Sequence, residues 1–392
     1  MRVLLVSSSS GSTGGGEVYL YYLACGLVRL GHQVCALCST SPEMDKFAEV
    51  LGTVAEITRV DTNNTYQRPA RSLSAAIDYI QQRRLTRIFH EICPEILHVN
   101  QQVAEDGLDL VLAARRSGIP FLSTIHISRS AEELSARFGR VRDIVTGRVL
   151  RSVNAVHLTV AESARAELLQ RFSFFSPGQV RVVVNGVFNS NPQEEVRNDI
   201  RRRWGLSKDE VVLGSVGRLE PQKAPLFGLE IVASLRRKGF PVRYLWIGDG
   251  PMRPQFEKSA LELGIGDYVR LDGWRQDVSN CLQGLDVLVM PSNYEGMPLA
   301  LLEGMSAGLC CCGSDIDGIS EAIEHESSGY LCRPGDLDDW CQQLEMLIRD
   351  PDRRITAGKR GREVAQQRFS VESMARATAD AYRDVMRSHR VT

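Results

Sequence analysis

Two glutamates placed eight positions apart, Glu295 and Glu303, form the most informative pair of side chains in this sequence. Glu295 follows the apolar run 287–290, whose length and composition predict a short buried strand. Glu303 falls in the helix predicted next, because Pro298 suits the first turn of a helix. Open α/β sheets bind ligands beyond the carboxyl ends of their strands, and helix N-termini attract phosphate. Since a carboxylate can accept two hydroxyl hydrogen bonds, this pattern predicts a phosphorylated ligand with sugars at both ends.

Two cations follow the first predicted strand of the same half of the chain. Arg218 and Lys223 lie five positions apart in the loop after the strand 211–216. Together they could neutralise two phosphate charges, arginine through a bidentate contact and lysine as a point charge. A solvated basic loop is the alternative. Gly250 lies in another loop at this edge and would let the backbone approach a ligand, although an ordinary turn explains it nearly as well.

The first loop of the chain, residues 7–17, is rich in serine and glycine and joins the first predicted strand to the first predicted helix. Its spacing matches neither a dinucleotide-binding G-x-G-x-x-G pattern nor a Walker A loop, which would need a following lysine. Gly15 and Gly16 belong to a run of three glycines that would let backbone N–H groups approach a ligand closely. We therefore expect ligand contact here rather than a flexible surface loop.

His126 ends the apolar run 121–125, and a histidine at the carboxyl end of a strand faces the ligand edge in this fold class. It could act as an acid–base group or donate a hydrogen bond to a sugar. A purely structural histidine is an equally good interpretation. No cluster of His, Cys, Asp or Glu has the spacing of a metal site, and the pair Asp315 and Asp317 is better read as a turn with a helix cap. We expect neither a metal nor another cofactor.

Apolar runs alternate with amphipathic stretches along almost the whole chain, as in the helix pattern 17–30 that Gly31 closes. This order is typical of parallel sheets covered by helices on both faces. Eleven strands are many for one open sheet, so the sequence predicts two doubly wound, Rossmann-like α/β domains. The predicted strands span 3–6, 33–37, 96–99, 121–125, 155–159, 180–184, 211–216, 242–247, 269–271, 287–290 and 309–312.

The domain boundary is predicted in the segment 185–192, where turn-forming residues cluster before a helix over 194–204. This gives a first domain over 1–187 and a second over 188–370, with the ligand expected in a central cleft that the two domains face. A last helix pattern, at about 371–392, has no strand after it and is expected to pack back on the first domain. The polar segment 62–70 is predicted to be a mobile loop near the cleft.

The composition is typical of a globular protein with substantial cores. The chain has 392 residues, a 43% hydrophobic content and a formal net charge of −1, which suit two domains and give no support for nucleic-acid binding. Its ten cysteines form no spaced framework, and Cys35 and Cys38 are better read as buried strand residues than as a redox or metal pair. Reduced thiols, the lack of a leader pattern and the lack of an apolar run of about 18 residues predict a cytoplasmic location.

Two helix patterns rich in arginine leave peripheral contact with a membrane open. Basic amphipathic helices can bind anionic lipid. The near-zero net charge favours the simpler interpretation of solvated helix faces. The arginines are Arg83, Arg84 and Arg87 in the first pattern and Arg137, Arg140, Arg142, Arg148 and Arg151 in the second.

Seven motifs occur in a fixed order: Gly-Gly-Gly-Glu at 14–17, Thr-Ile-His at 124–126, Val-Asn-Gly-Val at 184–187, Gly-Arg-Leu at 217–219 with Lys223, Gly-Asp-Gly-Pro at 248–251, Glu-Gly-Met-Pro at 295–298 with Glu303, and Gly-Tyr-Leu at 329–331. Over nearly its whole length the chain therefore resembles retaining nucleotide-sugar glycosyltransferases of the GT-B fold, in glycosyltransferase family 4 (glycosyl transferases group 1). The two spaced glutamates with the upstream arginine and lysine are the most specific part. The chain departs from the family where Gly304 replaces the usual alanine and Ala224 the usual glycine.

The resemblance implies retaining transfer of a hexose-type sugar, without a metal, from a UDP- or GDP-sugar to a glycan, lipid-linked or small-molecule acceptor. It implies that Arg218 and Lys223 hold the donor diphosphate and that Glu303 binds the ribose hydroxyls. Glu295 would contact the transferred sugar with His126 beside it, which makes these two the candidate catalytic residues. The further donor contacts that it implies are Gly15, Gly16, Gly250, Gly296, Met297, Pro298 and Leu299.

Three other readings stay open at this point. Another nucleotide-sugar enzyme on this fold, such as an epimerase or a phosphorylase, would share the donor site. A catalytically silent relative would act as a binding partner, although the cations and both glutamates are present. A dinucleotide-dependent oxidoreductase would fit two doubly wound domains, but the glycine fingerprint is missing.

Overall fold

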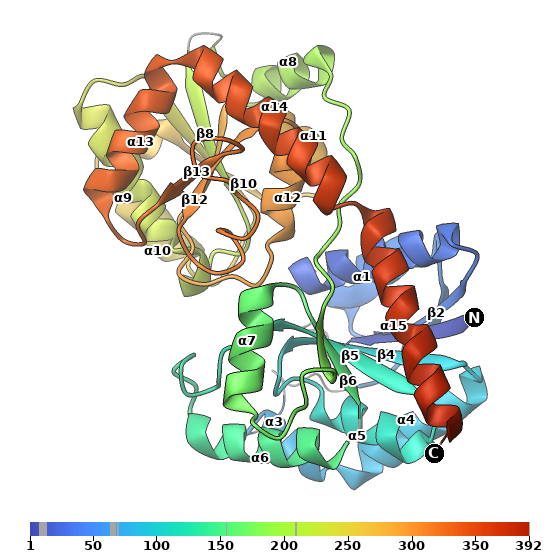
Figure 1. The fold of residues 1–392 in the computed structure, drawn as a ribbon. Coiled ribbons are helices and arrows are strands. Elements are labelled where there is room, and N and C mark those ends of the chain that lie inside the picture. Colours follow the sequence, from blue (N-terminus) through green and yellow to red (C-terminus); the bar gives the residue numbers. More distant parts are fainter. Residues whose placement is uncertain (8–13, 63–67, 69, 154, 208–209, 392) are drawn as a thin grey trace. The chain divides into compact units, whose positions relative to one another are not determined.

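The structure, a computed structural model, describes residues 1–7, 14–62, 68, 70–153, 155–207 and 210–391 (Figure 1). The chain divides into two compact units, Met1–Gly186 with Val371–Thr392, and Val187–Ser370. This division lies one residue before the predicted boundary, and the last helix groups with the first unit. Residues 8–13 of the glycine-serine loop and residues 63–67 and 69 of the predicted mobile loop lie outside the described residues.

The first unit is built on a seven-stranded parallel sheet with the order β3-β2-β1-β4-β5-β6-β7. The six strands predicted here are confirmed. β3 was not predicted, because only one of its five side chains is buried and it carries no apolar run. The strands are β1 (Arg2–Ser7), β2 (Gln33–Ser39), β3 (Glu56–Val60), β4 (Ile96–Val103), β5 (Phe121–Ile127), β6 (Val156–Thr159) and β7 (Val180–Val182).

Helices cover both faces of this sheet, with α1 and α15 on one side and α4, α5 and α6 on the other (Figure 1). α15 packs against α1, where a Cβ at Gly26 would lie 2.6 Å from the Cβ of Ala375, so the close approach requires glycine. The helices are α1 (Gly15–Arg29), α2 (Asp45–Leu51), α3 (Ser72–Ile77), α4 (Tyr79–Ile92), α5 (Leu108–Ser117), α6 (Gly139–Ser152), α7 (Glu162–Arg171), α15 (Val371–Val391) and the 3-10 turn η1 (Pro42–Met44).

The second unit repeats this plan with a six-stranded parallel sheet in the order β10-β9-β8-β11-β12-β13. Its five predicted strands are confirmed, while β13 was too short to predict. The strands are β8 (Val211–Val216), β9 (Val242–Ile247), β10 (Val269–Gly273), β11 (Val287–Met290), β12 (Cys310–Ser314) and β13 (Tyr330–Cys332).

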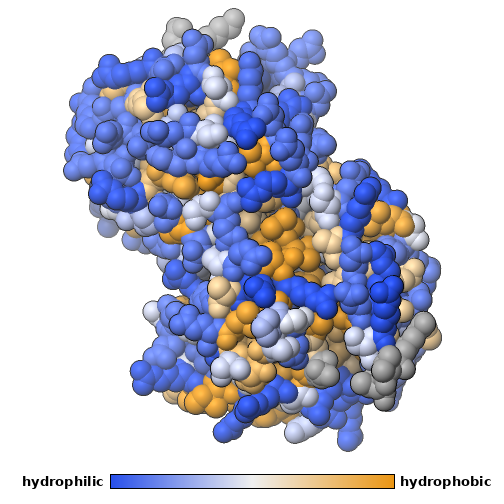
Figure 2. Space-filling model, viewed as in Figure 1, coloured by the Kyte–Doolittle hydropathy of each residue, from blue (hydrophilic) through white to orange (hydrophobic). Residues whose placement is uncertain are grey.

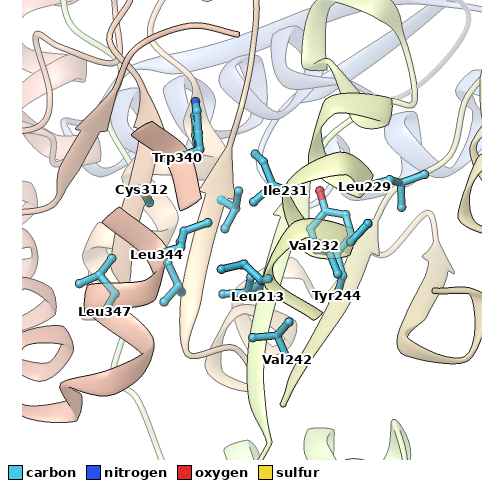
Figure 3. Close-up of a cluster of buried hydrophobic side chains, with 14 of the residues drawn as sticks. Leu213, Leu229, Ile231, Val232, Val242, Tyr244, Cys312, Trp340, Leu344 and Leu347 are labelled. Carbon is cyan, nitrogen blue, oxygen red and sulfur yellow. The ribbon is translucent and has the colours of Figure 1, made fainter. Parts of the chain in front are cut away.

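The core of the second unit forms where α9 and α13 pack on this sheet (Figure 3). Leu213 and Tyr244 from the strands meet Ile231 from α9, and Trp340 and Leu344 come from α13. The helices are α8 (Glu194–Arg203), α9 (Pro225–Arg237), α10 (Arg253–Glu262), α11 (Val278–Gln283), α12 (Leu299–Ser306), α13 (Leu337–Arg349) and α14 (Pro351–Arg368), with 3-10 turns η2 (Pro221–Lys223) and η3 (Gly266–Tyr268).

The cysteines are unpaired and mostly buried. Cys35 and Cys38 are 1% and 4% exposed on β2, which confirms them as buried strand residues. In the part of the chain that the structure describes, no helix combines the length and the apolar character needed to cross a membrane.

Candidate active site

Each sheet reverses its strand order at one point, and open parallel sheets bind ligands at such points. In the second unit the reversal lies between β8 and β11, because the chain extends the sheet first on one side and then on the other. In the first unit it lies between β1 and β4. Arg218 and Lys223 follow β8 and Glu295 follows β11, while His126 lies on β5, beside β4. The predicted residues therefore cluster at the ligand edge of each unit.

Polar contacts join the loop after β8 to the loop after β11. Lys223 Nζ lies 2.5 Å from Glu295 Oε1. Gln222 Nε2 donates to the carbonyl of Tyr294 at 3.1 Å and to Glu295 Oε2 at 3.3 Å. The backbone N–H of Asn293 donates to the carbonyl of Gln222 at 2.8 Å. The structure thus brings Lys223 and Glu295, which are 72 positions apart, into one ion pair.

Glu295 is withdrawn from solvent. Its side chain is 4% exposed, whereas that of Lys223 is 19% exposed. A buried carboxylate destabilises the fold unless it is paired and hydrogen-bonded. Here Lys223 donates to one oxygen of Glu295, and Gln222 donates to the other. An anion that binds Lys223 must therefore compete with Glu295.

The backbone after Lys223 adopts a conformation that glycine tolerates best. Ala224 has φ +45° and ψ 52°, in the left-handed region, between η2 and the start of α9. For a residue with a Cβ, this left-handed conformation is less stable by about 1 kcal/mol. The chain therefore keeps this turn with an alanine, despite the cost.

Helix α12 directs its N-terminus at the same loops. Pro298 is its N-cap, with extended backbone (φ −71°, ψ 120°), so the prediction that Pro298 lies in the first helical turn was wrong by one position. No side chain among the described residues caps this helix. Gly296, Met297 and Leu299 are buried, and Glu303 lies half-buried one turn into the helix. Such an uncapped N-terminus favours an anionic ligand.

Two glycines fix this segment by close packing. A Cβ at Gly318, which has φ +80°, would lie 1.5 Å from the carbonyl oxygen of Gly296. A Cβ at Gly304 would lie 2.7 Å from Cδ2 of Leu288 on β11. Gly304 therefore lets α12 lie closely against the sheet.

Arg218 and Gly250 differ in how the surrounding fold constrains them. The side chain of Arg218 is 43% exposed, with its Nη1 3.4 Å from Glu220 Oε1. A Cβ at Gly250 would lie 2.7 Å from both the backbone nitrogen and the carbonyl oxygen of Leu219. Packing alone therefore requires glycine at 250, so this glycine is no sign of a ligand by itself.

In the first unit, His126 lies in a polar cluster at the end of β5. It is 8% exposed, and its Nε2 lies 2.8 Å from Oδ1 of Asn100, on the neighbouring strand β4. The ring of Tyr19 packs edge-on against it, with centroids 4.6 Å apart. Burial lowers the pKa of His126 to about 4. The imidazole is therefore neutral at pH 7, which argues against a role as a charged acid.

Gly15 and Gly16 open helix α1 beside this cluster. A Cβ at Gly16 would lie 2.2 Å from Nε2 of Gln102, whereas a Cβ at Gly15 would meet no atom within 4 Å of the described structure. A side chain at Gly16 would require the end of the Gln102 side chain to move, and Gly15 lies at an open surface.

Sequence reasoning missed Asn100 and a hollow beside β10. Trp274 is 45% exposed directly after β10, and together with Arg275, Gln276 and Asp277 it lines a surface hollow. A tryptophan that follows a predicted strand was a signal that could have been used. Asn100 gave no such signal, because its partner lies on another strand.

The arginine-rich helix patterns are only partly solvated. Arg142 is buried, and its Nη2 lies 2.5 Å from Oε1 of Glu105, so its inclusion in a basic face was wrong. Arg140 and Arg148 on the same helix are exposed.

The structure also bears on the predicted turn at Asp315 and Asp317. Residues 315–322 form bends and turns, so the turn is confirmed and the helix cap is wrong. Within the described ranges, no group of three or more His, Cys, Asp or Glu side chains could hold a metal ion.

The sequence matches known proteins along most of its length. The family described as Glycosyltransferase Family 4 matches residues 13–188, and that described as Glycosyl transferases group 1 matches residues 196–364. The D-inositol 3-phosphate glycosyltransferase of Saccharomonospora viridis is 30% identical over 295 residues, which are 72% of this chain and 68% of that protein. The UDP-Gal:alpha-D-GlcNAc-diphosphoundecaprenol alpha-1,3-galactosyltransferase of Escherichia coli is 27% identical over 270 residues, 67% of each chain.

Solved structures share the fold at low sequence identity. Anabaena Alr3699/HepE, crystallised in complex with UDP and glucose, has a TM-score of 0.80 at 19% identity, over 98% of this chain and 100% of that chain. The sucrose-phosphate synthase of Thermosynechococcus elongatus has a TM-score of 0.80 at 19% identity, over 99% and 100%. By sequence and by fold, this chain belongs to the GT-B glycosyltransferases of glycosyltransferase family 4, the glycosyl transferases group 1.

Proposed function

We propose that this glycosyltransferase moves a hexose-type sugar, with retention of configuration, from a UDP- or GDP-sugar to a glycan, lipid-linked or small-molecule acceptor. The observation that carries the proposal is the meeting of Lys223, Glu295 and the N-terminus of α12 at the strand reversal of the second unit. Its relatives add support: one solved structure holds UDP and glucose, and the name of one relative specifies UDP-Gal as donor.

The cations would act on the leaving group. As the sugar–phosphate bond breaks, positive charge develops at the anomeric carbon and negative charge on the diphosphate. Arg218, Lys223 and the first N–H groups of α12 would stabilise that anion more strongly in the transition state than in the ground state. These groups supply the charge for which other enzymes use a metal, so we propose metal-independent transfer.

Exchange of partners at Lys223 would link donor binding to catalysis. The diphosphate would displace the Glu295 carboxylate from Lys223, and that carboxylate would then accept hydrogen bonds from hydroxyls of the transferred sugar. The acceptor oxygen would attack from the face that the phosphate leaves, and the departing phosphate oxygen would take the acceptor's proton. Retention follows from this geometry without a protein nucleophile.

The function is tested by offering UDP-glucose, UDP-GlcNAc, UDP-galactose and GDP-mannose, first by thermal shift and then by analysis of products. We expect one donor to raise the melting temperature and to be hydrolysed slowly or transferred, with the α-configured sugar kept in the product. A changed sugar still attached to its nucleotide would identify an epimerase instead. Binding without any turnover in the presence of candidate acceptors would identify a catalytically silent relative.

Glu303→Ala is expected to weaken binding of the free nucleotide by about tenfold or more. Without the charged carboxylate, both ribose hydroxyls lose their hydrogen-bond acceptor. Titration calorimetry with UDP or GDP measures the effect. Glu262→Ala on α10, which removes an exposed carboxylate of the same unit, serves as the control and should bind as the wild type does. Equal affinity for Glu303→Ala and wild type would remove the ribose assignment.

We also propose that α6 rests on anionic lipid. Phe138, Val141 and Ile144 are 60%, 50% and 56% exposed, and Arg140 and Arg148 lie exposed among them. Figure 2 shows apolar surface interleaved with hydrophilic side chains at the lower end of this unit. Apolar side chains flanked by arginine complement a negatively charged lipid surface.

The lipid proposal predicts cosedimentation with phosphatidylglycerol vesicles but not with phosphatidylcholine vesicles, weakened by salt. Replacing Val141 and Ile144 together with aspartate should reduce the sedimented fraction by about fivefold. Ile355→Asp, at a 52% exposed position of α14, is the control. Protein that stays in the supernatant with anionic vesicles would rule the contact out.

A further inference from the structure

Asn100 on β4 holds the ring of His126 on the neighbouring strand β5. In the parallel register of β4 and β5, Asn100 lies opposite Thr124. Its side chain therefore reaches His126, two positions further along β5. Asn100 Oδ1 and His126 Nε2 are 2.8 Å apart, and the two residues are 2% and 8% exposed. The contact is therefore buried, and water does not compete for it.

The other end of the Asn100 amide fixes which way it points. Its Nδ2 lies 3.3 Å from the backbone carbonyl of Gly16 and 3.3 Å from Oγ of Ser7. A carbonyl can only accept a hydrogen bond, so the amide NH₂ group must face Gly16. The carbonyl oxygen of the amide must then face His126.

This orientation determines the tautomer of the histidine. Because Asn100 Oδ1 can only accept, His126 Nε2 must carry the hydrogen. In the neutral ring Nδ1 then has a lone pair and no hydrogen. Within the described part of the chain Nδ1 has no hydrogen-bond partner.

Tyr19 restricts the ring further. Its ring stands at 82° to that of His126, and its hydroxyl lies 3.2 Å from Oγ1 of Thr124. Thr124 is held in turn by Nε2 of His98 at 2.8 Å. The imidazole is thereby enclosed by groups whose own positions are fixed by hydrogen bonds.

We propose that Asn100 is a positioning residue that fixes His126 as the Nε2–H tautomer, so that His126 accepts a hydrogen bond from a substrate hydroxyl through Nδ1 and does not donate one. The proposal rests on the proposed function for the identity of that hydroxyl, which belongs to the donor sugar or to the acceptor. It assigns the site a preference for a ligand group that can donate, such as a hydroxyl, over an ether or a fluorine at the same place.

Neighbouring titratable groups leave this arrangement unchanged near neutral pH. The side chains that face His126 are Tyr19 from α1 and His98 from β4. Burial raises the pKa of Tyr19 to about 12 and lowers that of His98 to about 3. Neither changes its charge between pH 5 and pH 9.

The tautomer is tested on the full chain labelled with ¹⁵N-histidine, by long-range ¹H–¹⁵N correlation. The His126 signals are identified by their loss in His126→Gln. We expect the pattern of a neutral, Nε2-protonated ring from pH 5 to pH 8 in the wild type, without any ligand. A ring protonated at Nδ1, or an imidazolium at pH 7, would overturn the proposal whatever the activity.

Two variants test the positioning role. Asn100→Asp offers a carboxylate that favours the charged ring, so the His126 signals should titrate at a pKa raised by more than one unit, and kcat should fall on the acid side of the pH profile. Asn100→Ser leaves the tautomer unfixed and should lower kcat by about tenfold with the donor found in the screen. His157, a buried histidine bonded to Ser123, is the internal reference, and its signals should not move if the fold is intact.

The outcomes separate this proposal from the proposed function. If the enzyme transfers sugar and both variants keep the wild-type kcat and pH profile with an intact His157 signal, the positioning role is wrong and the proposed function stands. If no nucleotide sugar is turned over, the tautomer measurement still decides the ring's protonation.

Discussion

Replacing Lys223 with alanine is expected to lower kcat/KM for the nucleotide-sugar donor by about a hundredfold or more. In the proposed reaction Lys223 stabilises the charge that develops on the diphosphate, so its loss raises the barrier as well as weakening binding. Initial rates with the donor identified in the screen measure the effect. Lys238→Ala is the matched control, because Lys238 also pairs with a glutamate, Glu345, at 48% exposure in the same unit. It should stay within about twofold of wild type.

Glu295→Gln should not weaken nucleotide binding, in contrast to Lys223→Ala. The amide keeps the size of the carboxylate but no longer competes for Lys223, so free UDP should bind as tightly as to wild type or more tightly. Turnover should fall by about tenfold or more, because a hydrogen-bond acceptor for the transferred sugar becomes weaker. Calorimetry with UDP beside initial rates separates the two effects. If Glu295→Gln lost UDP binding while Lys223→Ala kept it, the proposed exchange of partners at Lys223 would be wrong.

The ion pair between Lys223 and Glu295 could not be predicted from the sequence. Spacing placed Lys223 in the loop after β8 and Glu295 in the loop after β11. It could not show that β8 and β11 are neighbours, since that depends on the strand order of the whole sheet. Only the folded chain reveals that the two proposed donor contacts neutralise each other.

The strands themselves were largely readable. In parallel sheets both faces are buried, so most strands are continuous apolar runs that stand out in the sequence. β3 and β13 were not predicted, for different reasons. β3 lies at an edge of its sheet and has one buried side chain, and β13 has only three residues. Neither carries a proposed site residue, which is why the site could be found without them.

Arg142 illustrates a signal that was present but misread. The sequence pattern groups it with the surrounding arginines in a basic face. The buried positions of α6 include Gly139, Thr146, Val149 and Leu150, and Arg142 falls on this stripe. A charge on the buried face of a helix calls for a partner elsewhere in the chain, here Glu105. Periodicity would have predicted a buried ion pair but not its partner.

Acid should destabilise this protein well above the pH at which its carboxylates titrate. Burial lowers the pKa of His98 to about 3 and the pKa values of His126 and His157 to about 4. In the unfolded chain each would titrate near 6.5. The unfolded state therefore binds more protons below pH 6.5, and the free energy of unfolding falls as the pH falls through that value. Lowering the pH from 7 to 5 should cost about 2 kcal/mol for each histidine.

The three histidines lie on the adjacent strands β4, β5 and β6, so the loss concentrates in the first unit. Burial raises the pKa of Asp109 in this unit, which acts in the opposite direction but on one group. Urea unfolding at pH 7 and pH 5 measures the difference, and equal stability at both would contradict it. His157→Gln should remove about 2 kcal/mol of the pH dependence, whatever it costs at pH 7. Because His157 lies outside the proposed site, this test separates the effect of burying a neutral imidazole from any role in catalysis.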